Sequence, residues 1–156
     1  MTHISALDYA QRLIACESVT PATGGVFDVL EDMLAPLGFT VERFISGEND
    51  DNPAHGAPVE NLFAIRESGG RHFAFAGHVD VVPSGDGWAS NPFVPEIKGD
   101  FLHGRGAVDM KGSIAAFVAA LHDIPKDAGT ISMIITGDEE GPAIHGTRAL
   151  ITHMQA

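Results

Sequence analysis

Three short stretches of the sequence combine histidine or carboxylate side chains with glycines that let a backbone turn tightly. In the first, Gly77-His-Val-Asp-Val-Val82, an apolar run ends in His78 and Asp80. Residues two apart in an extended chain point to the same side. Asp80 could therefore accept a hydrogen bond from one imidazole nitrogen while the other faces a metal ion. A surface histidine beside a solvated aspartate is the alternative, which we favour for this motif taken alone.

The second stretch, Gly104-Arg-Gly-Ala-Val-Asp-Met-Lys-Gly112, leads into an apolar helical pattern. Its glycines allow close backbone approach, and Asp109 is placed to cap the helix or to bind a metal. Taken alone, the cap is the favoured interpretation. The spacing matches neither Gly-x-x-x-x-Gly-Lys-Ser/Thr nor Gly-x-Gly-x-x-Gly, which argues against nucleotide binding.

The third stretch places Asp138, Glu139 and Glu140 directly after an apolar strand. Three carboxylates at a buried strand end repel one another unless a cation or protonation compensates. Neighbouring side chains in an extended chain point apart, so that one could bind metal while the next handles protons. A solvated acidic turn is an equal alternative for this stretch alone.

Taken together, the three stretches favour a metal centre. Ligands of α/β sheets bind beyond the carboxyl ends of the strands, where one histidine and several carboxylates can converge on a metal ion. The other histidines are not assigned to a site. Five are expected at surface or packing positions, and two that lie near the motifs stay unassigned. The five are His3, His55, His72, His122 and His153, and the two are His103 and His145.

Hydrophobic periodicity predicts the elements that must position these residues. Helices are expected over about 5–16, 25–37, 110–123 and 145–155, strands over 39–45, 61–66, 72–76 and 130–136, and a hairpin over 96–103. The mostly apolar strands 72–76 and 130–136 should be buried on both faces. The segment 47–56 is expected to be a polar loop with its acidic residues in water. Alternating strands and helices predict a three-layer α/β domain with helices on both faces of the sheet.

Composition bounds the class of protein. The 156 residues fit one domain, and 9 Lys+Arg against 21 Asp+Glu give a net charge of −12, which excludes nucleic acid and anionic membrane surfaces as partners. The apolar run 114–121 is far shorter than the roughly 20 residues of a membrane span. A single cysteine and a start without the features of a signal peptide predict a cytoplasmic protein.

At these residues the chain resembles the M20 family of zinc-dependent amidohydrolases and exopeptidases. The resemblance rests on motifs in family order and at family spacing: Gly77-His-Val-Asp-Val-Val-Pro83, Trp88 with Pro92-Phe93, Gly104-Arg-Gly-Ala-Val-Asp-Met-Lys-Gly112 and Asp138-Glu-Glu140. It implies a zinc-exopeptidase-like catalytic domain, with helices on both faces of a mostly parallel or mixed sheet. Residues 1–156 would form its N-terminal part. The lid and dimerisation domain and the C-terminal part of the catalytic domain would be absent.

Carried over by position, the resemblance implies a site for two zinc ions, which cobalt can replace. His78 would bind one zinc, Glu140 the other, and Asp109 would bridge them. Asp80 would orient His78, and Glu139 would be the general base. The family also uses a further acidic ligand and a C-terminal histidine, both of which lie beyond this chain.

The implied activity is metal-assisted hydrolysis of the amide bond of a small N-acyl amino acid. Phe75–Thr147 is most similar to family members that remove succinate from an N-succinyl diamino acid in lysine and diaminopimelate biosynthesis. The full-length protein would be a homodimer. Two alternatives stay open: an acetylornithine deacetylase or aminoacylase of the same family, and a catalytically dead metal-binding fragment.

Overall fold

The computed structural model describes residues 5–155. His3 lies outside the described residues, as do the first four residues of the start that is expected to lack signal-peptide features. The regular elements are α1 (Ala6–Ile14), α2 (Val26–Leu34), β1 (Thr40–Ser46), β2 (Val59–Arg66), β3 (His72–His78), β4 (Glu96–Lys98), β5 (Phe101–His103), α3 (Gly112–Ala120), β6 (Thr130–Thr136) and α4 (Thr147–Met154). None of the helices described is long and apolar enough to span a membrane.

A four-stranded mixed sheet with the order β1-β2-β6-β3 organises the domain. β2 pairs antiparallel with β1 and β6, whereas β3 pairs parallel with β6. The predicted α/β class is confirmed, although only one of the three strand pairings is parallel. β4 and β5 form the predicted separate hairpin, turning at Gly99 and Asp100.

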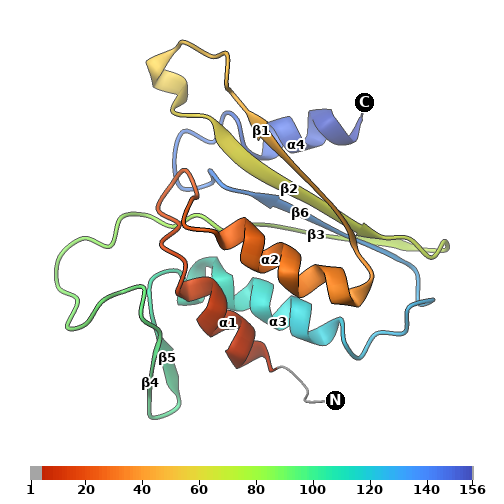
Figure 1. The fold of residues 1–156 in the computed structure, drawn as a ribbon, viewed down its shortest axis with the longest axis horizontal. Coiled ribbons are helices and arrows are strands. Elements are labelled where there is room, and N and C mark those ends of the chain that lie inside the picture. The colour runs from red at the N-terminus through yellow and green to blue at the C-terminus, as the bar shows by residue number, and fades with distance from the viewer. Residues whose placement is uncertain (1–4, 156) are drawn as a thin grey trace.

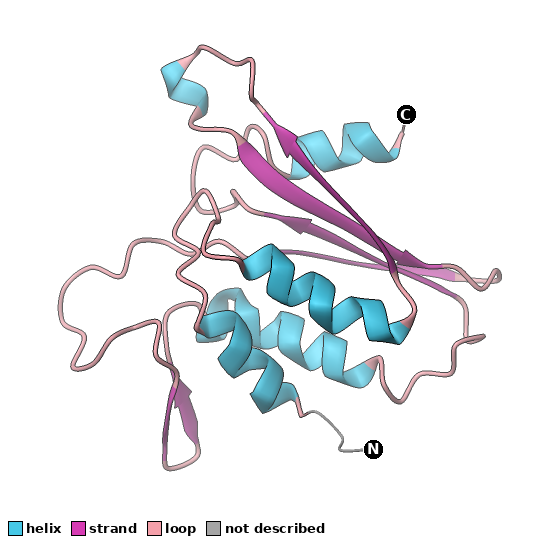
Figure 2. Ribbon diagram, viewed as in Figure 1, coloured by secondary structure: helices cyan, strands magenta, loops and turns pink. Residues whose placement is uncertain are grey.

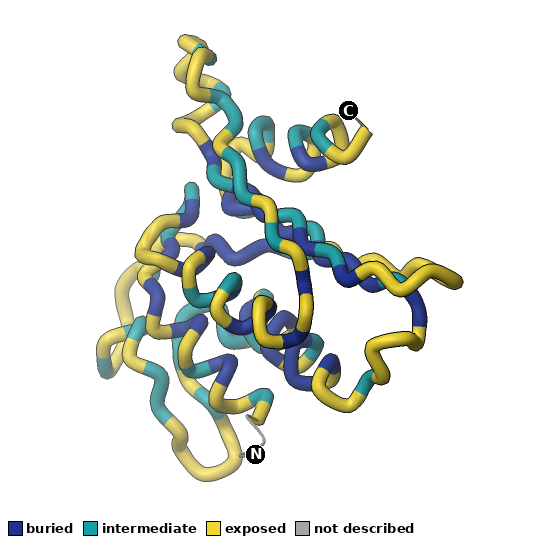
Figure 3. Tube along the Cα trace, turned by 45° about the vertical axis from the view of Figure 1, so that its right-hand side comes forward, coloured by how far each residue is buried: buried dark blue, intermediate teal, exposed yellow. Residues whose placement is uncertain are grey.

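The helices lie on both faces of this sheet. α1, α2 and α3 gather on one face, and α4 lies against the other (Figures 1 and 2). The main core fills the space between the sheet and the first three helices, and it includes Leu13, Leu30, Ile114, Leu62 and Met133. Figure 3 shows buried backbone running through the middle of the sheet and the facing sides of these helices.

Local sequence signals account for the first two helices. Ser5 caps α1 by accepting a hydrogen bond from the Asp8 amide, and the Asp8 side chain accepts one from the Ser5 amide in return. The apolar spacing from Val26 onward gives α2, which tightens into a 3-10 turn at Ala35–Leu37. Pro36 lies within that turn, and Gly38, with φ 84°, ends it.

The two apolar strands differ in burial, which corrects one expectation. β6 is buried along most of its length, whereas most of β3 is exposed or half-buried and Phe73 is 58 % exposed. The reason is position: β6 lies between β2 and β3, but β3 is an edge strand of the sheet that the described residues form. The apolar side chains of β3 are therefore only partly covered by their neighbours. Phe73 and Phe75, for example, stack on Phe117 of α3.

Candidate metal centre

Two parallel strands end side by side and set the location of the site. His78 is the last residue of β3 and pairs with Thr136, the last residue of β6. The chain segments that follow both strands therefore start at the same edge of the sheet, as expected for parallel neighbours. The Val79 amide continues the ladder by donating to the Thr136 carbonyl.

His78 lies between the side chains of two aspartates. Its Nε2 is 3.1 Å from Oδ1 of Asp109. Its Nδ1 is 3.1 Å from the carbonyl oxygen of Asp80 and 3.4 Å from Oδ1 of the same residue. The Nδ1 contacts fix the ring orientation and leave Nε2 facing the open side of the site.

Asp80 also holds the acidic loop after β6. Its fully buried carboxylate accepts hydrogen bonds from the backbone amides of Glu139, at 3.0 and 3.1 Å, and of Glu140, at 2.9 Å. The two loops at the strand ends are therefore tied together through one side chain. The predicted contact with His78 is present, whereas no sequence pattern indicates these amide bonds.

One carboxylate from each of two loops completes a convergent group with the histidine. Ligand atoms of His78, Asp109 and Glu140 all lie within 4.8 Å of one another, and we call these three residues the strand-end cluster. Glu139 lies beside it, with Oε2 3.8 Å from Nε2 of His78. The five predicted site residues thus meet at one edge of the sheet.

Asp109 does not cap a helix, which corrects the interpretation favoured for its stretch alone. Its backbone is extended (φ −125°, ψ 100°) and interrupts a helical turn at Ala107–Lys111, three residues before α3 begins at Gly112. The extended conformation points the carboxylate at His78. The helix expected over 110–123 correspondingly starts two residues later and ends at Ala120.

Asp138 is separate from the strand-end cluster. Its buried carboxylate accepts hydrogen bonds from the Thr20 hydroxyl (3.2 Å) and the Ala143 amide (2.9 Å). Burial raises the pKa of Asp138 despite these bonds. The three consecutive acids are therefore not one repelling group, because the first of them stabilises its own loop.

The electrostatics of the site favour a bound cation. The hydrogen bond with Asp80 is the largest cause that raises the pKa of His78 to about 9, and Asp109 adds to it. Burial raises the pKa of Glu140, and the charges of Asp109 and Glu139 add to that shift. Burial opposes ionisation of Asp80, but its bonds with His78 and the two amides keep its pKa below the ordinary value. A positive charge at this position is therefore favoured by the surrounding carboxylates.

The donor set fits zinc. One imidazole nitrogen and two carboxylates are among the ligands that zinc prefers, and the aspartate behind His78 is the partner that metal-bound histidines usually have. A cleft of about 480 Å³ opens beside Asp109 and Glu140 and is also bordered by Trp88, His103 and Arg105. The cluster is thus within reach of a small molecule.

Lys111 is a buried residue next to the site that sequence reasoning passed over. Its side chain is fully buried, and Nζ donates a 2.9 Å hydrogen bond to the Cys16 carbonyl. Burial lowers the pKa of Lys111 to about 8. The bond ties the Asp109 segment to the end of α1. The sequence signal for its burial is a lone lysine between Met110 and Gly112, at the start of an apolar helix.

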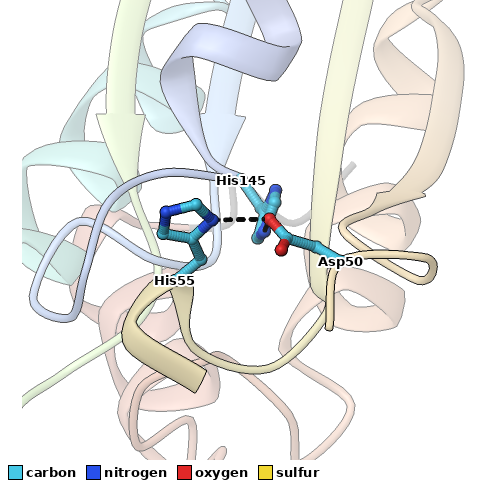
Figure 4. Close-up of side chains that lie close together, drawn as sticks. All are labelled: Asp50, His55 and His145. Atoms are coloured by element: carbon cyan, nitrogen blue, oxygen red, sulfur yellow. Dashed lines mark hydrogen bonds and ion pairs between the residues drawn. The ribbon is translucent and has the colours of Figure 1, made fainter. Parts of the chain in front are cut away.

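Five of the remaining histidines divide into two groups. Surface or packing roles are confirmed for three: His72 contacts Ser132, His122 contacts Tyr9, and His153 stacks on Phe44. His55 and His145 instead converge on Asp50, so the acidic loop 47–56 is not simply solvated (Figure 4).

Comparisons with known proteins agree with this geometry. The model of peptidase family M20/M25/M40 matches residues 74–156. The chain is 65% identical over 153 residues to a succinyl-diaminopimelate desuccinylase of Erythrobacter litoralis and 66% identical over 155 residues to one of Sphingopyxis alaskensis. The alignments cover 97% and 99% of this chain but 40% of each relative. The chain therefore spans about two fifths of the length of these relatives.

Solved structures share the fold. Human carnosine dipeptidase 1 superposes with a TM-score of 0.69 at 26% identity, over 90% of this chain and 33% of that protein. The aminopeptidase PepT of Bacillus cereus gives a TM-score of 0.63 at 23% identity, over 86% and 36% of the two chains.

Proposed function

The chain belongs to peptidase family M20/M25/M40, and from this membership we propose that the whole protein is a zinc-dependent amidohydrolase. The proposed reaction removes succinate from N-succinyl-LL-2,6-diaminopimelate and releases the free diamino acid. The names of relatives at 65% and 66% identity support this substrate. The observation that carries the proposal is the convergence of His78, Asp109 and Glu140 beside an open cleft, with Glu139 next to them.

The proposed metal ligands follow the contacts of the strand-end cluster. His78 and Asp109 would hold one zinc ion, and Asp109 and Glu140 a second; cobalt can take the same places. Bound zinc lowers the pKa of a coordinated water and polarises a carbonyl oxygen. Asp80 would keep Nε2 of His78 turned toward the metal through its contacts with Nδ1.

Glu139 is the proposed general base. Its carboxylate is close to the cluster, and its side chain is 56 % exposed, so water from the cleft reaches it. Glu139 would take a proton from the attacking water and return it to the leaving amine nitrogen. The hydrogen bond from its own backbone amide to Asp80 would hold the residue in place while its side chain changes protonation state.

We further propose that residues outside this chain complete the site. Each zinc would have two protein ligands here, whereas catalytic zinc usually has three. The free edge of β3 is the proposed place where the remaining part of a zinc-exopeptidase-like catalytic domain pairs with this one. We also propose that the whole protein carries a lid and dimerisation domain. It would form a homodimer and would be located in the cytoplasm. On this basis residues 1–156 alone should be nearly inactive.

The test compares substrates on the whole protein loaded with zinc. We expect release of succinate from N-succinyl-LL-2,6-diaminopimelate with a kcat/KM at least about tenfold above that for acetylornithine or simple N-acetyl amino acids, since a site that pairs a polar group rejects analogues lacking it. A chelator should abolish turnover, and added zinc should restore it. Faster hydrolysis of acetylornithine would overturn the substrate, and no amide hydrolysis at all would overturn the activity.

A further inference from the structure

We propose that Asp50, His55 and His145, here called the loop cluster, form a second metal site for a divalent transition metal such as zinc. The three side chains converge from two loops that are far apart in the sequence (Figure 4). Their ligand atoms all lie within 4.8 Å of one another. The proposal does not rest on the proposed enzymatic activity.

The carboxylate of Asp50 lies between the two imidazole rings. Its Oδ2 is 2.7 Å from Nδ1 of His55 and 3.0 Å from Nε2 of His145. Its Oδ1 accepts a 3.0 Å hydrogen bond from the Asn52 amide, which fixes the orientation of the carboxylate. Two nitrogens and one oxygen therefore face a common point.

The buried ring of His145 supplies a second observation that favours a cation at this position. Its side chain is only 12 % exposed, and its Nε2 is buried without a hydrogen bond, although Oδ2 of Asp50 is 3.0 Å away. A buried polar atom without a hydrogen bond is unfavourable, because it has given up its bonds with water. A metal ion coordinated by Nε2 and by the carboxylate would satisfy both groups.

The backbone is shaped to let the two loops meet. Gly47 has φ +91°, and a Cβ built on it would lie 2.5 Å from the ring of His145. A Cβ on Gly56 (φ +81°) would lie 3.0 Å from the Pro142 ring. Asn61 of β2 also donates a 2.9 Å hydrogen bond to the His145 carbonyl. The imidazole of His145 is therefore held in position before any metal binds.

The ligand types select the class of metal. Two imidazoles with one carboxylate suit zinc and its first-row neighbours, whereas calcium takes six to eight oxygen ligands. Asp50 and His55 border an open groove between β1 and α4. Water from this groove would complete the coordination, as expected for a site with three protein ligands.

Binding requires one local rearrangement. Nε2 of His55 lies 3.0 Å from Nδ2 of Asn52, so in the metal-free chain Nε2 accepts and Nδ1 carries the proton. A metal at Nδ1 displaces that proton, and Nε2 must then donate. Turning the Asn52 amide over would offer its oxygen to Nε2, the kind of partner that metal-bound histidines usually have, and would break the 3.1 Å hydrogen bond that this oxygen accepts from the Ala54 amide.

A metal here would act on the neighbouring site through the backbone. His145 follows Glu139 and Glu140 in the same loop, which Asp80 anchors at its other end. The ion would fasten this loop to the β1–β2 connection. We therefore assign the loop cluster a structural role, with the metal holding the acidic loop rather than taking part in chemistry.

The experiment measures zinc binding to the 156-residue chain by equilibrium dialysis, in a background that disables the strand-end cluster (Asp109→Asn with Glu140→Gln). We expect one bound equivalent. Adding His145→Asn or His55→Gln should weaken zinc binding by more than about 10–100-fold. That range is the loss typical when a residue that only hydrogen-bonds to a metal ligand is changed. His153→Gln, which changes a histidine on the same face of the domain, is the matched control and should bind like the background.

A second readout uses cobalt in place of zinc, since its visible absorption reports the number and type of ligands. The background chain should show a cobalt spectrum that His145→Asn abolishes and His153→Gln preserves. His55 is the more exposed histidine of the cluster, so His55→Gln decides the question if His145→Asn loses its circular dichroism signal. No bound zinc in the background, or equal affinity in the His55→Gln variant and the control, would overturn the proposal.

Discussion

The strand-end cluster and the loop cluster differ in the balance between histidines and acids. The first combines His78 with Asp109 and Glu140 and has Glu139 and Asp80 beside it, whereas the second combines two histidines with Asp50 alone. Catalysis needs a base that remains free after the metal is bound. Among the residues described, the strand-end cluster has an additional acid, Glu139, within 4 Å of His78, and it borders a cleft that Trp88 and Arg105 also line.

The two clusters also differ in how the fold builds them. His78 ends β3 and Glu140 follows β6, so the register of these two paired strands sets part of the geometry of the strand-end cluster, and the extended backbone at Asp109 supplies the rest. The loop cluster depends on glycines that allow two loops to approach. We infer that changes in the first should affect chemistry most, whereas changes in the second should affect stability most.

The largest expected effect is on turnover of the whole protein. Glu139→Gln should lower kcat by about 10²–10⁴-fold, the usual contribution of general acid–base catalysis, because an amide of the same shape cannot accept a proton. Metal content should stay unchanged, as measured by elemental analysis. His145→Asn should keep turnover within about tenfold of the unaltered protein. Near-normal turnover of Glu139→Gln would remove its role as base.

The next effect concerns the residue behind the metal ligand. Asp80→Asn places an amide group against the backbone amides of Glu139 and Glu140, which then lose one of their acceptors. We expect zinc affinity of the strand-end cluster to fall by about 10–100-fold. Competition with a chromophoric chelator measures this affinity. Asp100→Asn, at an exposed turn, is the control, and equal affinities of the two variants would show that Asp80 does not support the site.

Much of the fold follows from signals that act over a few residues. The Ser5–Asp8 capping box, the apolar spacing of α2 and the Gly99-Asp100 turn each predicted an element that the structure contains. The burial of β3 could not be predicted in this way, because it depends on which strand lies at the sheet edge. That order is a property of the whole topology.

The same distinction applies to the two clusters. His78 and Asp80 share one side of an extended chain, and Asp138-Glu-Glu140 follows a strand, so their grouping could be predicted from position along parallel strands. His145 is 90 residues from His55 in the sequence and lies on a loop. No periodicity relates two loops, and only the folded backbone brings these side chains together. The sequence therefore indicated one cluster and not the other.

A smaller effect is expected where the loop cluster depends on close backbone approach. Gly47→Ala introduces a Cβ against the His145 ring at a positive φ. Gly69→Ala is the matched control, because Gly69 has a similar positive φ (+71°) and open space around it. Crowding should make the Gly47 variant less stable than the control by about 1–3 kcal/mol, as measured by urea unfolding. Equal stability would show that the two loops do not press on each other.

The smallest effect is the pH dependence that Asp50 contributes to the metal-free chain. The hydrogen bond from His55, with a further one from the Asn52 amide, holds the pKa of Asp50 below its ordinary value of 3.8. A carboxyl whose folded-state pKa is depressed binds fewer protons folded than unfolded. Its stabilisation is therefore present above that ordinary value and is lost as the pH falls through the folded pKa. In the presence of a chelator, Asp50→Asn should lower the urea midpoint at pH 6, and this deficit should shrink as the pH falls below 3.8. A deficit that stays the same over this range would mean that the charge of the carboxylate does not hold the two imidazoles in place.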